Sequence, residues 1–150
     1  MGTRSGATMP RTTRVCGLTL LDAVPRPVTM ARMNRILIVD DNAGFRVQAR
    51  ALLEADGFDV VGESTDGLSG LSDARRLRPD LVLLDIGLPD VEGFEVARSL
   101  ADDGQPPYVV LTSSREATEY GPRLTTSRAL GFLPKDELSG PAIRALADAV

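Results

Sequence analysis

The sequence predicts an α/β fold in which helices cover both faces of a doubly wound, five-stranded parallel sheet. Short apolar runs alternate with longer segments whose apolar residues recur at helical spacing. The runs are nearly continuous in apolar side chains, as expected for strands that are buried on both faces. Because strands that alternate with helices are typical of βαβ units, the chain of 150 residues is predicted to form one domain with one parallel sheet.

The first two strands and helices are predicted between Arg35 and Pro79. The runs "RILIVDD" and "FDVVGES" predict strands one and two. The segment "NAGFRVQARALLEADG" predicts a helix that ends at Gly57, and "DGLSGLSDARRLRPD" predicts one that ends before Pro79. The expected inward residues are Phe45, Val47, Ala51, Leu52 and Leu53 in the first helix, and Leu68, Leu71 and Leu77 in the second.

The remaining elements follow the same alternation. The runs "LVLLD", "YVVLTSS" and "GFLPK" predict strands three to five, "EGFEVARSLADDG" predicts a helix, and "SGPAIRALADAV" predicts a closing helix with Pro141 in its first turn. The stripe of the third helix is Phe94, Val96, Ala97 and Leu100. Gly121 and Pro122 interrupt the segment before strand five, so we expect a short, mobile helix that begins near Pro122. Five such strands fit a flavodoxin-like sheet of order 2-1-3-4-5.

The composition excludes several classes of protein. The chain has no histidine, which removes the usual general base and a Ser-His-Asp triad. Its one cysteine, Cys16, cannot form an internal disulfide, which favours a reducing compartment. No apolar run approaches the roughly 20 residues that a membrane span needs. We therefore expect a cytoplasmic protein that has no membrane partner.

Charge divides the chain into two parts. Residues 1–32 carry five arginines and one acid, whereas residues 33–150 have a net charge of −8. Residues 1–33 are predicted to be a disordered, basic extension before a domain at 34–150; a basic interaction arm, or a true start at Met30 or Met33, are alternatives. An acidic domain argues against direct binding of nucleic acid and favours metal cations or basic partners.

Polar side chains stand at the carboxyl ends of the predicted strands, where doubly wound sheets bind their ligands. Strand one ends in Asp40 and Asp41, and strand three, its expected neighbour, ends in Asp85. Three converging carboxylates repel one another unless a cation lies among them, and hard oxygen ligands at an open edge suit Mg²⁺. Strand four ends in Thr112 and Ser113. Strand five ends in Lys135, the only lysine beside 16 arginines.

The motifs "ILIVDDN", "DLVLLDIGLPDVEGFEV", "VVLTSS" and "GFLPK" resemble the receiver domain of bacterial two-component response regulators over residues 34–150. The resemblance implies that Asp85 accepts a phosphoryl group from a sensor histidine kinase or a phosphotransfer protein. It further implies that Asp40, Asp41, Asp85 and the backbone carbonyl of Gly87 bind Mg²⁺.

The same resemblance assigns roles to residues beside the acceptor. Thr112 would donate a hydrogen bond to the phosphoryl group, and Lys135 would pair first with Asp85 and then with that group. Phe132 and Ser113 would belong to the switch that reads phosphorylation out to a downstream protein partner or a homodimer. The chain would then be a phosphoprotein that takes part in a phosphorelay. It would catalyse only its own phosphorylation and dephosphorylation.

Four positions depart from the family pattern. Gly87 and Ser114 are small where larger side chains often screen the phosphoryl group, which predicts an open site and a short-lived phosphorylated state. Phe132 lacks the hydroxyl of the tyrosine often found there, so switching would work by packing. Asp136 stands where proline is common, so a cis peptide bond is not expected after Lys135.

Other functions remain open. The chain leaves no room for an output domain, which predicts a stand-alone receiver, although a DNA-binding regulator that lost its output domain would share the same chemistry. A magnesium-dependent phosphohydrolase with an aspartate nucleophile needs a carboxylate two residues after it, where Gly87 stands. A degenerate receiver would lack one of the acids, and none is missing.

Overall fold

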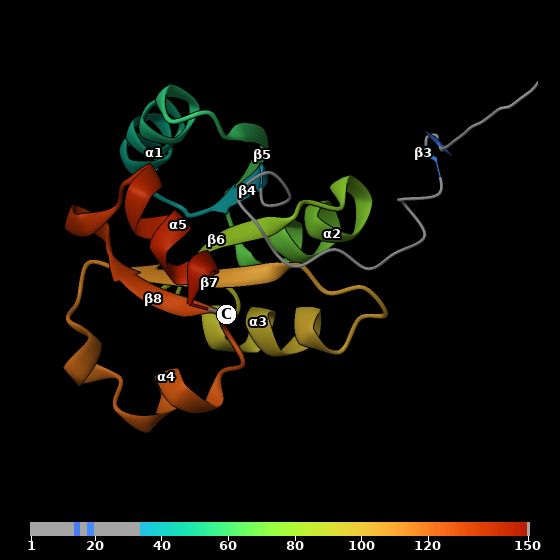
Figure 1. The fold of residues 1–150 in the computed structure, drawn as a ribbon. Helices are drawn as coiled ribbons and strands as arrows, with labels where there is room; N and C mark the ends of the chain where they lie inside the picture. Colours follow the sequence, from blue (N-terminus) through green and yellow to red (C-terminus); the bar gives the residue numbers. More distant parts are fainter. Residues whose placement is uncertain (1–13, 16–17, 20–33, 150) are drawn as a thin grey trace, which may run out of the picture.

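The computed structural model describes residues 14–15, 18–19 and 34–149 (Figure 1). The prediction of a disordered extension over residues 1–33 lies almost entirely outside these residues. Within that range, β2 (Arg14–Val15) and β3 (Leu18–Thr19) pair as a separate two-stranded sheet. In the described part of the chain, no helix is long and apolar enough to span a membrane.

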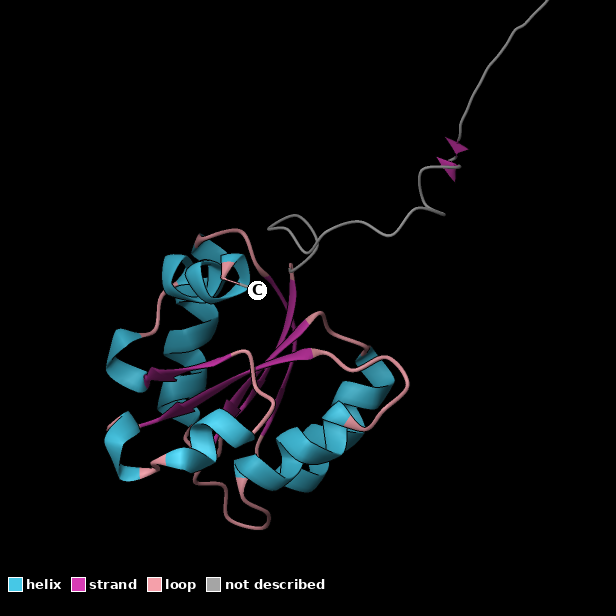
Figure 2. Cartoon of the chain, turned by 60° about the horizontal axis from the view of Figure 1, so that its bottom comes forward, coloured by secondary structure: helices cyan, strands magenta, loops and turns pink. Residues whose placement is uncertain are grey.

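The main sheet has five parallel strands in the order β5-β4-β6-β7-β8. Its strands are β4 (Arg35–Val39), β5 (Asp59–Ser64), β6 (Leu81–Asp85), β7 (Tyr108–Ser113) and β8 (Gly131–Pro134). Counted along the chain, this is the predicted order 2-1-3-4-5. The central strands β4 and β6 are buried almost throughout, because helices cover both faces of the sheet (Figure 2).

The helices divide between the two faces. They are α1 (Ala43–Ala55), α2 (Gly67–Leu77), α3 (Gly93–Ala101), α4 (Pro122–Thr126) and α5 (Gly140–Asp148), with 3₁₀ turns η3 (Ala117–Glu119) and η4 (Lys135–Glu137). Helices α1 and α5 pack on one face around Leu53 and Ile143. Helices α2 and α3 pack on the other around Ala74 and Phe94. The predicted stripe of α3 is confirmed, because all four of its residues are buried.

The predicted inward face of α1 is partly wrong. Ala49 and Leu53 are its buried residues, whereas Ala51 and Leu52 are exposed and 69% of Val47 is exposed. Only a narrow stripe of α1 reaches the sheet, so the additional apolar residues face outward.

Helix α2 lies on the sheet through small residues. Its buried positions are Gly67, Gly70 and Ala74, and a Cβ atom at Gly70 would lie 2.8 Å from Cγ1 of Val39. This close approach turns Leu68 outward, with 61% of the residue exposed, which corrects its prediction as an inward residue.

The segment between β7 and β8 contains only short helical pieces. Helix α4 begins at Pro122, as predicted, and has five residues. Gly121 before it has φ of 56°, a conformation that glycine adopts without steric cost. Neither η3 nor α4 contributes a fully buried residue, and this segment packs on the domain through the partly buried Tyr120 and Leu124.

Candidate functional site

Four of the predicted side chains leave the sheet on the same face, at its carboxyl edge. Successive side chains of a strand point to opposite faces, and Asp40 follows Ile38, which belongs to the core beneath α1 and α5. Asp85, Thr112 and Lys135 continue the same alternation at the ends of β6, β7 and β8. Parallel pairing places Asp85 directly opposite Thr112. The fold therefore brings these residues together, as the sequence predicts.

Three carboxylates form the centre of the site. Asp40, Asp41 and Asp85 each offer a carboxylate oxygen within 4.8 Å of the others. Asp40 is fully buried and Asp85 is 5% exposed, whereas Asp41 faces solvent. The amide N–H of Asn42 donates to Oδ1 of Asp40 over 2.8 Å, which fixes the orientation of that carboxylate. Three oxygens at this spacing, one of them open to water, fit a hydrated divalent cation such as Mg²⁺.

Lys135 reaches into this acidic cluster from the end of β8. Its Nζ atom lies 2.7 Å from Oδ2 of Asp40 and 3.7 Å from Oδ2 of Asp85. The shorter contact is an ion pair without hydrogen-bond geometry at the carboxylate oxygen. Nζ also lies 4.7 Å from the centroid of the Phe45 ring, a cation–π contact. The lysine thus contacts Asp40 more closely than Asp85, the partner that the resemblance implies.

The environment of Asp85 disfavours its charge. Burial raises the pKa of the Asp85 carboxyl above its ordinary value, and the negative charge of Asp40 raises it further. Lys135 and the amide N–H of Gly87, which donates to Oδ1 over 3.2 Å, lower the pKa but do not cancel the rise. A cation at this site would therefore stabilise Asp85 in the ionised, nucleophilic form.

Thr112 and Gly87 flank the Asp85 carboxylate. The hydroxyl oxygen of Thr112 is buried and has no hydrogen-bond partner, so it is free to bind a group placed on Asp85. A Cβ atom built on Gly87 would meet nothing within 4 Å, and Ser114 is exposed. The site is therefore open on this side. Ligation of a metal by the Gly87 carbonyl remains a prediction.

The opposite face of the same edge holds Ser113, Phe132 and a residue that the sequence did not single out, Tyr120. The hydroxyls of Ser113 and Tyr120 share a hydrogen bond of 2.6 Å. The Tyr120 ring lies between Phe94 and Phe132, with centroid distances of 5.8 and 6.0 Å. Phe132 is half-buried and packs in this aromatic group. No local pattern signals these contacts, because they depend on how the segment after β7 folds back.

Asp90 is a second residue that the sequence analysis missed. Its Oδ1 accepts the N–H of Gly67 over 2.7 Å, and its Oδ2 accepts the N–H of Leu68 over 2.9 Å. The hydrogen bond from Leu68, followed by that from Gly67, lowers the pKa of the Asp90 carboxyl. Asp90 thus joins the loop after Asp85 to the start of α2. The partners are more than 20 residues apart in the sequence, so no local pattern indicates this contact.

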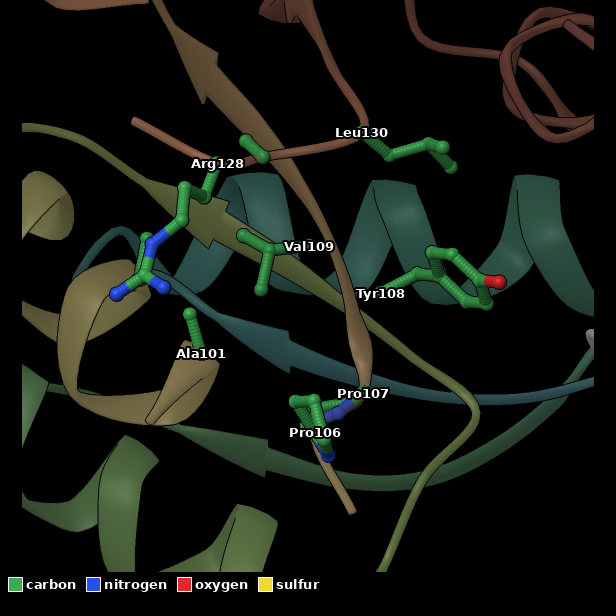
Figure 3. Close-up of a pocket in the computed structure, with 9 residues that line it drawn as sticks. Ala101, Pro106, Pro107, Tyr108, Val109, Arg128 and Leu130 are labelled. Atoms are coloured by element: carbon green, nitrogen blue, oxygen red, sulfur yellow. The ribbon is translucent and has the colours of Figure 1, made fainter. Parts of the chain in front are cut away.

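A pocket of about 460 Å³ lies at the other end of the sheet (Figure 3). Its walls include Tyr108 and Val109 at the start of β7, the end of α3, and Arg128, whose Nη2 lies 2.8 Å from Oδ1 of Asp102. Tyr108 and Thr112 stand near opposite ends of the same strand. The pocket is therefore separate from the acidic cluster.

Comparisons with known proteins match the domain. The response regulator receiver domain family matches residues 36–146. Over 104 residues the chain is 39% identical to BvgA of Bordetella pertussis, whose name describes a regulator of virulence-factor transcription; the match covers 69% of this chain and 50% of BvgA. Over 113 residues it is 40% identical to protein-glutamate methylesterase/protein-glutamine glutaminase 6 of Anaeromyxobacter dehalogenans, covering 74% of this chain and 32% of that enzyme.

A solved structure shows the same fold. The signal receiver domain of NarL from Mycobacterium tuberculosis superposes with a TM-score of 0.70 at 29% identity, covering 84% of this chain and 100% of that domain. The chain spans about half the length of BvgA, so the match concerns the receiver part alone. The family match covers most of the described domain, and the fold agrees with it. The chain therefore belongs to the response regulator receiver domain family.

Proposed function

We propose that this protein accepts a phosphoryl group on Asp85 from the phosphohistidine of a sensor histidine kinase or a phosphotransfer protein. The observation that carries the proposal is the convergence of Asp85 with two further acids and Lys135 at one edge of the sheet. This set offers a nucleophile, oxygen ligands for a cation and a fixed positive charge. Phosphoryl transfer needs little beyond such positioning and charge neutralisation.

Each residue of the cluster has a separate role in the proposed phosphoryl transfer. A carboxylate oxygen of Asp85 attacks phosphorus, the bond between phosphorus and the donor's imidazole nitrogen breaks, and the imidazole leaves with the electron pair and takes up a proton. Mg²⁺, held by Asp40, Asp41 and Asp85, would supply positive charge to the phosphoryl oxygens. Lys135 supplies charge from the other side, and the unpartnered hydroxyl of Thr112 donates to a phosphoryl oxygen. The product is an acyl phosphate on Asp85.

The output of the domain is proposed to be contact between proteins. Phosphorylation would change the surface around β7, β8 and the segment between them, which would bind a downstream protein, a further phosphorelay member or a second copy of the chain. The described domain is acidic, which disfavours direct contact with DNA. We expect the protein to act in the cytoplasm and to turn over no substrate besides its own phosphoryl group.

A second candidate is the receiver part of a DNA-binding regulator. It is favoured by the likeness to BvgA and to DNA-binding response regulator MtrA of Mycobacterium leprae, which is 42% identical over 87 residues, 57% of this chain and 37% of MtrA. The phosphoryl chemistry is the same in both candidates. The genomic neighbourhood of the coding sequence distinguishes them, because a separate output gene beside it would support the second.

Incubation with Mg²⁺ and acetyl phosphate or phosphoramidate, followed by intact mass spectrometry, tests the proposal. We expect one phosphoryl adduct in the wild type and none in Asp85→Asn. Asp59→Asn, which changes an exposed acid at the start of β5, is the matched control and should be modified like the wild type. Failure of several donors to modify the wild type would refute the proposed function.

A further inference from the structure

Tyr120 attaches the segment that follows β7 to the end of that strand. Its hydroxyl shares a hydrogen bond of 2.6 Å with Ser113, which is buried. Its ring contacts Phe94 edge-on and Phe132 at a tilt, so it packs on both neighbouring elements of that face. A tyrosine held by its ring and by its hydroxyl has one defined position.

Ser113 is the neighbour of a residue at the phosphoacceptor. Thr112 precedes it on the same strand, pairs with Asp85 and accepts the amide N–H of Ile86 at its carbonyl. The two hydroxyls point to opposite faces: that of Thr112 lies unpartnered beside the acidic cluster, and that of Ser113 is bonded to Tyr120. Because the two residues share one peptide unit, a shift of β7 that engages Thr112 also displaces the partner of Tyr120.

The segment after β7 depends on this attachment. Neither α4 nor η3 has a fully buried residue. Leu124 of α4 packs, partly buried, against the core, and Arg123 makes surface contacts. Arg123 pairs with Glu92 at 2.6 Å and lies 4.2 Å above the Phe94 ring. Exposed ion pairs of this kind contribute little to stability. The Ser113–Tyr120 hydrogen bond is therefore, beside the packing of Leu124, a contact that places this segment on the domain.

We propose that Tyr120 is a positioning residue through which phosphorylation of Asp85 sets the arrangement of residues 114–126. Phe132 has no hydroxyl group. The aromatic hydroxyl on this face belongs to Tyr120, in the segment after β7, and it bonds to Ser113. This inference rests on the proposed function. The position of residues 114–126 then depends on the hydrogen bond between the hydroxyls of Ser113 and Tyr120. The surface that this segment presents to a partner protein depends on the same bond.

The composition of the chain offers a direct readout. It has no tryptophan and two tyrosines, Tyr108 and Tyr120, so Tyr108→Phe leaves Tyr120 as the only strong source of ultraviolet emission. Phosphorylation by acetyl phosphate and Mg²⁺ should change the tyrosine emission of this variant, with the adduct followed by mass in the same sample. Addition of Asp85→Asn should abolish the change. Addition of Ser113→Ala should abolish it while the adduct still forms.

Hydrogen exchange supplies the second measurement. In the wild type, phosphorylation should change amide exchange over residues 114–126 by about fivefold, the ratio expected when one neutral hydrogen bond is altered. Tyr120→Phe keeps the ring and removes the hydroxyl. It should form the adduct yet lose this difference between the two states. Tyr108→Phe is the matched control and should respond like the wild type.

The outcomes separate the two claims. If no adduct forms in the wild type, the proposed function fails and this inference fails with it. If the adduct forms and the Tyr120 emission is unchanged, the inference alone is overturned. If Tyr120→Phe alters exchange equally with and without the phosphoryl group, Tyr120 is only structural, and the inference is likewise overturned.

Discussion

Lys135 occupies a narrow space between two carboxylates and an aromatic ring. Its amine contacts Asp40, reaches toward Asp85 and lies over Phe45, with 20% of the side chain exposed. A compact ammonium group on a flexible stem fits this place, whereas a planar guanidinium is wider and prefers bidentate contacts. The surroundings of Lys135 thus explain why an arginine-rich chain has a lysine here.

Lys135→Arg should therefore impair phosphorylation although it keeps the charge. We expect the initial rate of adduct formation from acetyl phosphate to fall at least about tenfold, which corresponds to about 1.4 kcal/mol of transition-state stabilisation. The rate is measured by intact mass against time. Arg128→Lys, the reverse exchange at an exposed position, is the control. A wild-type rate in Lys135→Arg would remove this explanation of the lysine.

The ionised Asp85 carboxylate lowers the stability of the folded protein at neutral pH. Because its pKa is raised in the folded protein, the ionised carboxylate destabilises the fold above that pKa, and the cost disappears below the pKa of the unfolded chain. Asp85→Asn should raise the melting temperature near pH 7, since each kcal/mol is worth about 2–8 °C. The gain should shrink as the pH falls toward about 4. Thermal melts across this range, with Asp59→Asn as control, check both signs; a gain that grows in acid would contradict the cause.

At the level of single elements, Gly87 in the loop after β6 and Gly93 at the start of α3 differ in the space around them. Gly87 faces open space, whereas a Cβ atom on Gly93 would collide with the backbone carbonyl of Asp85. Gly93→Ala should therefore cost about 1–3 kcal/mol of unfolding free energy, as overpacking does. Gly87→Ala should stay within about 0.5 kcal/mol of the wild type. Chemical denaturation of both variants measures this, and equal stabilities would show that the close approach at Gly93 is not rigid.

The same opening at Gly87 has a kinetic consequence. A longer side chain there can extend over the acceptor and hinder water, so Gly87→Asn should lengthen the lifetime of the phosphorylated state severalfold. Loss of the adduct after removal of the donor measures the lifetime. The exposed Ser114→Ala variant, which adds no screening group, should decay like the wild type. A wild-type lifetime of many hours would refute the view that the site is open to water.

Strand ends could be predicted from the sequence, and helix faces only in part. A buried parallel strand is a continuous apolar run whose last residue is visible, so Asp40, Asp85 and Lys135 were placed correctly. The face of α2 depends on how closely Gly70 approaches the sheet, which no periodicity reports. The contacts of Tyr120 and Asp90 could not be predicted from the sequence, because their partners lie in other elements and meet them only in the folded chain.

For the whole molecule, the acidic cluster should link stability to divalent cations. Binding of Mg²⁺ to the folded state alone should stabilise it by about 2.7 kcal/mol at a hundredfold excess over Kd. The melting temperature should therefore rise with Mg²⁺ concentration, and Asp41→Asn should weaken the response, because this exposed acid can be changed without disturbing the core. Asp59→Asn should respond like the wild type. An equal rise in Asp41→Asn would place the cation elsewhere.

The position of Lys135, partly buried in the acidic cluster, also makes the protein suitable for labelling. The chain has one side-chain amine, so a reagent that acylates amines can modify only Lys135 and the amino terminus. With its amine held against Asp40, Lys135 should react slowly in the folded protein, and anything that draws Asp40 away should change that rate. The covalent reactivity of a single atom thus reports the state of the acidic cluster, without an added dye or an engineered residue.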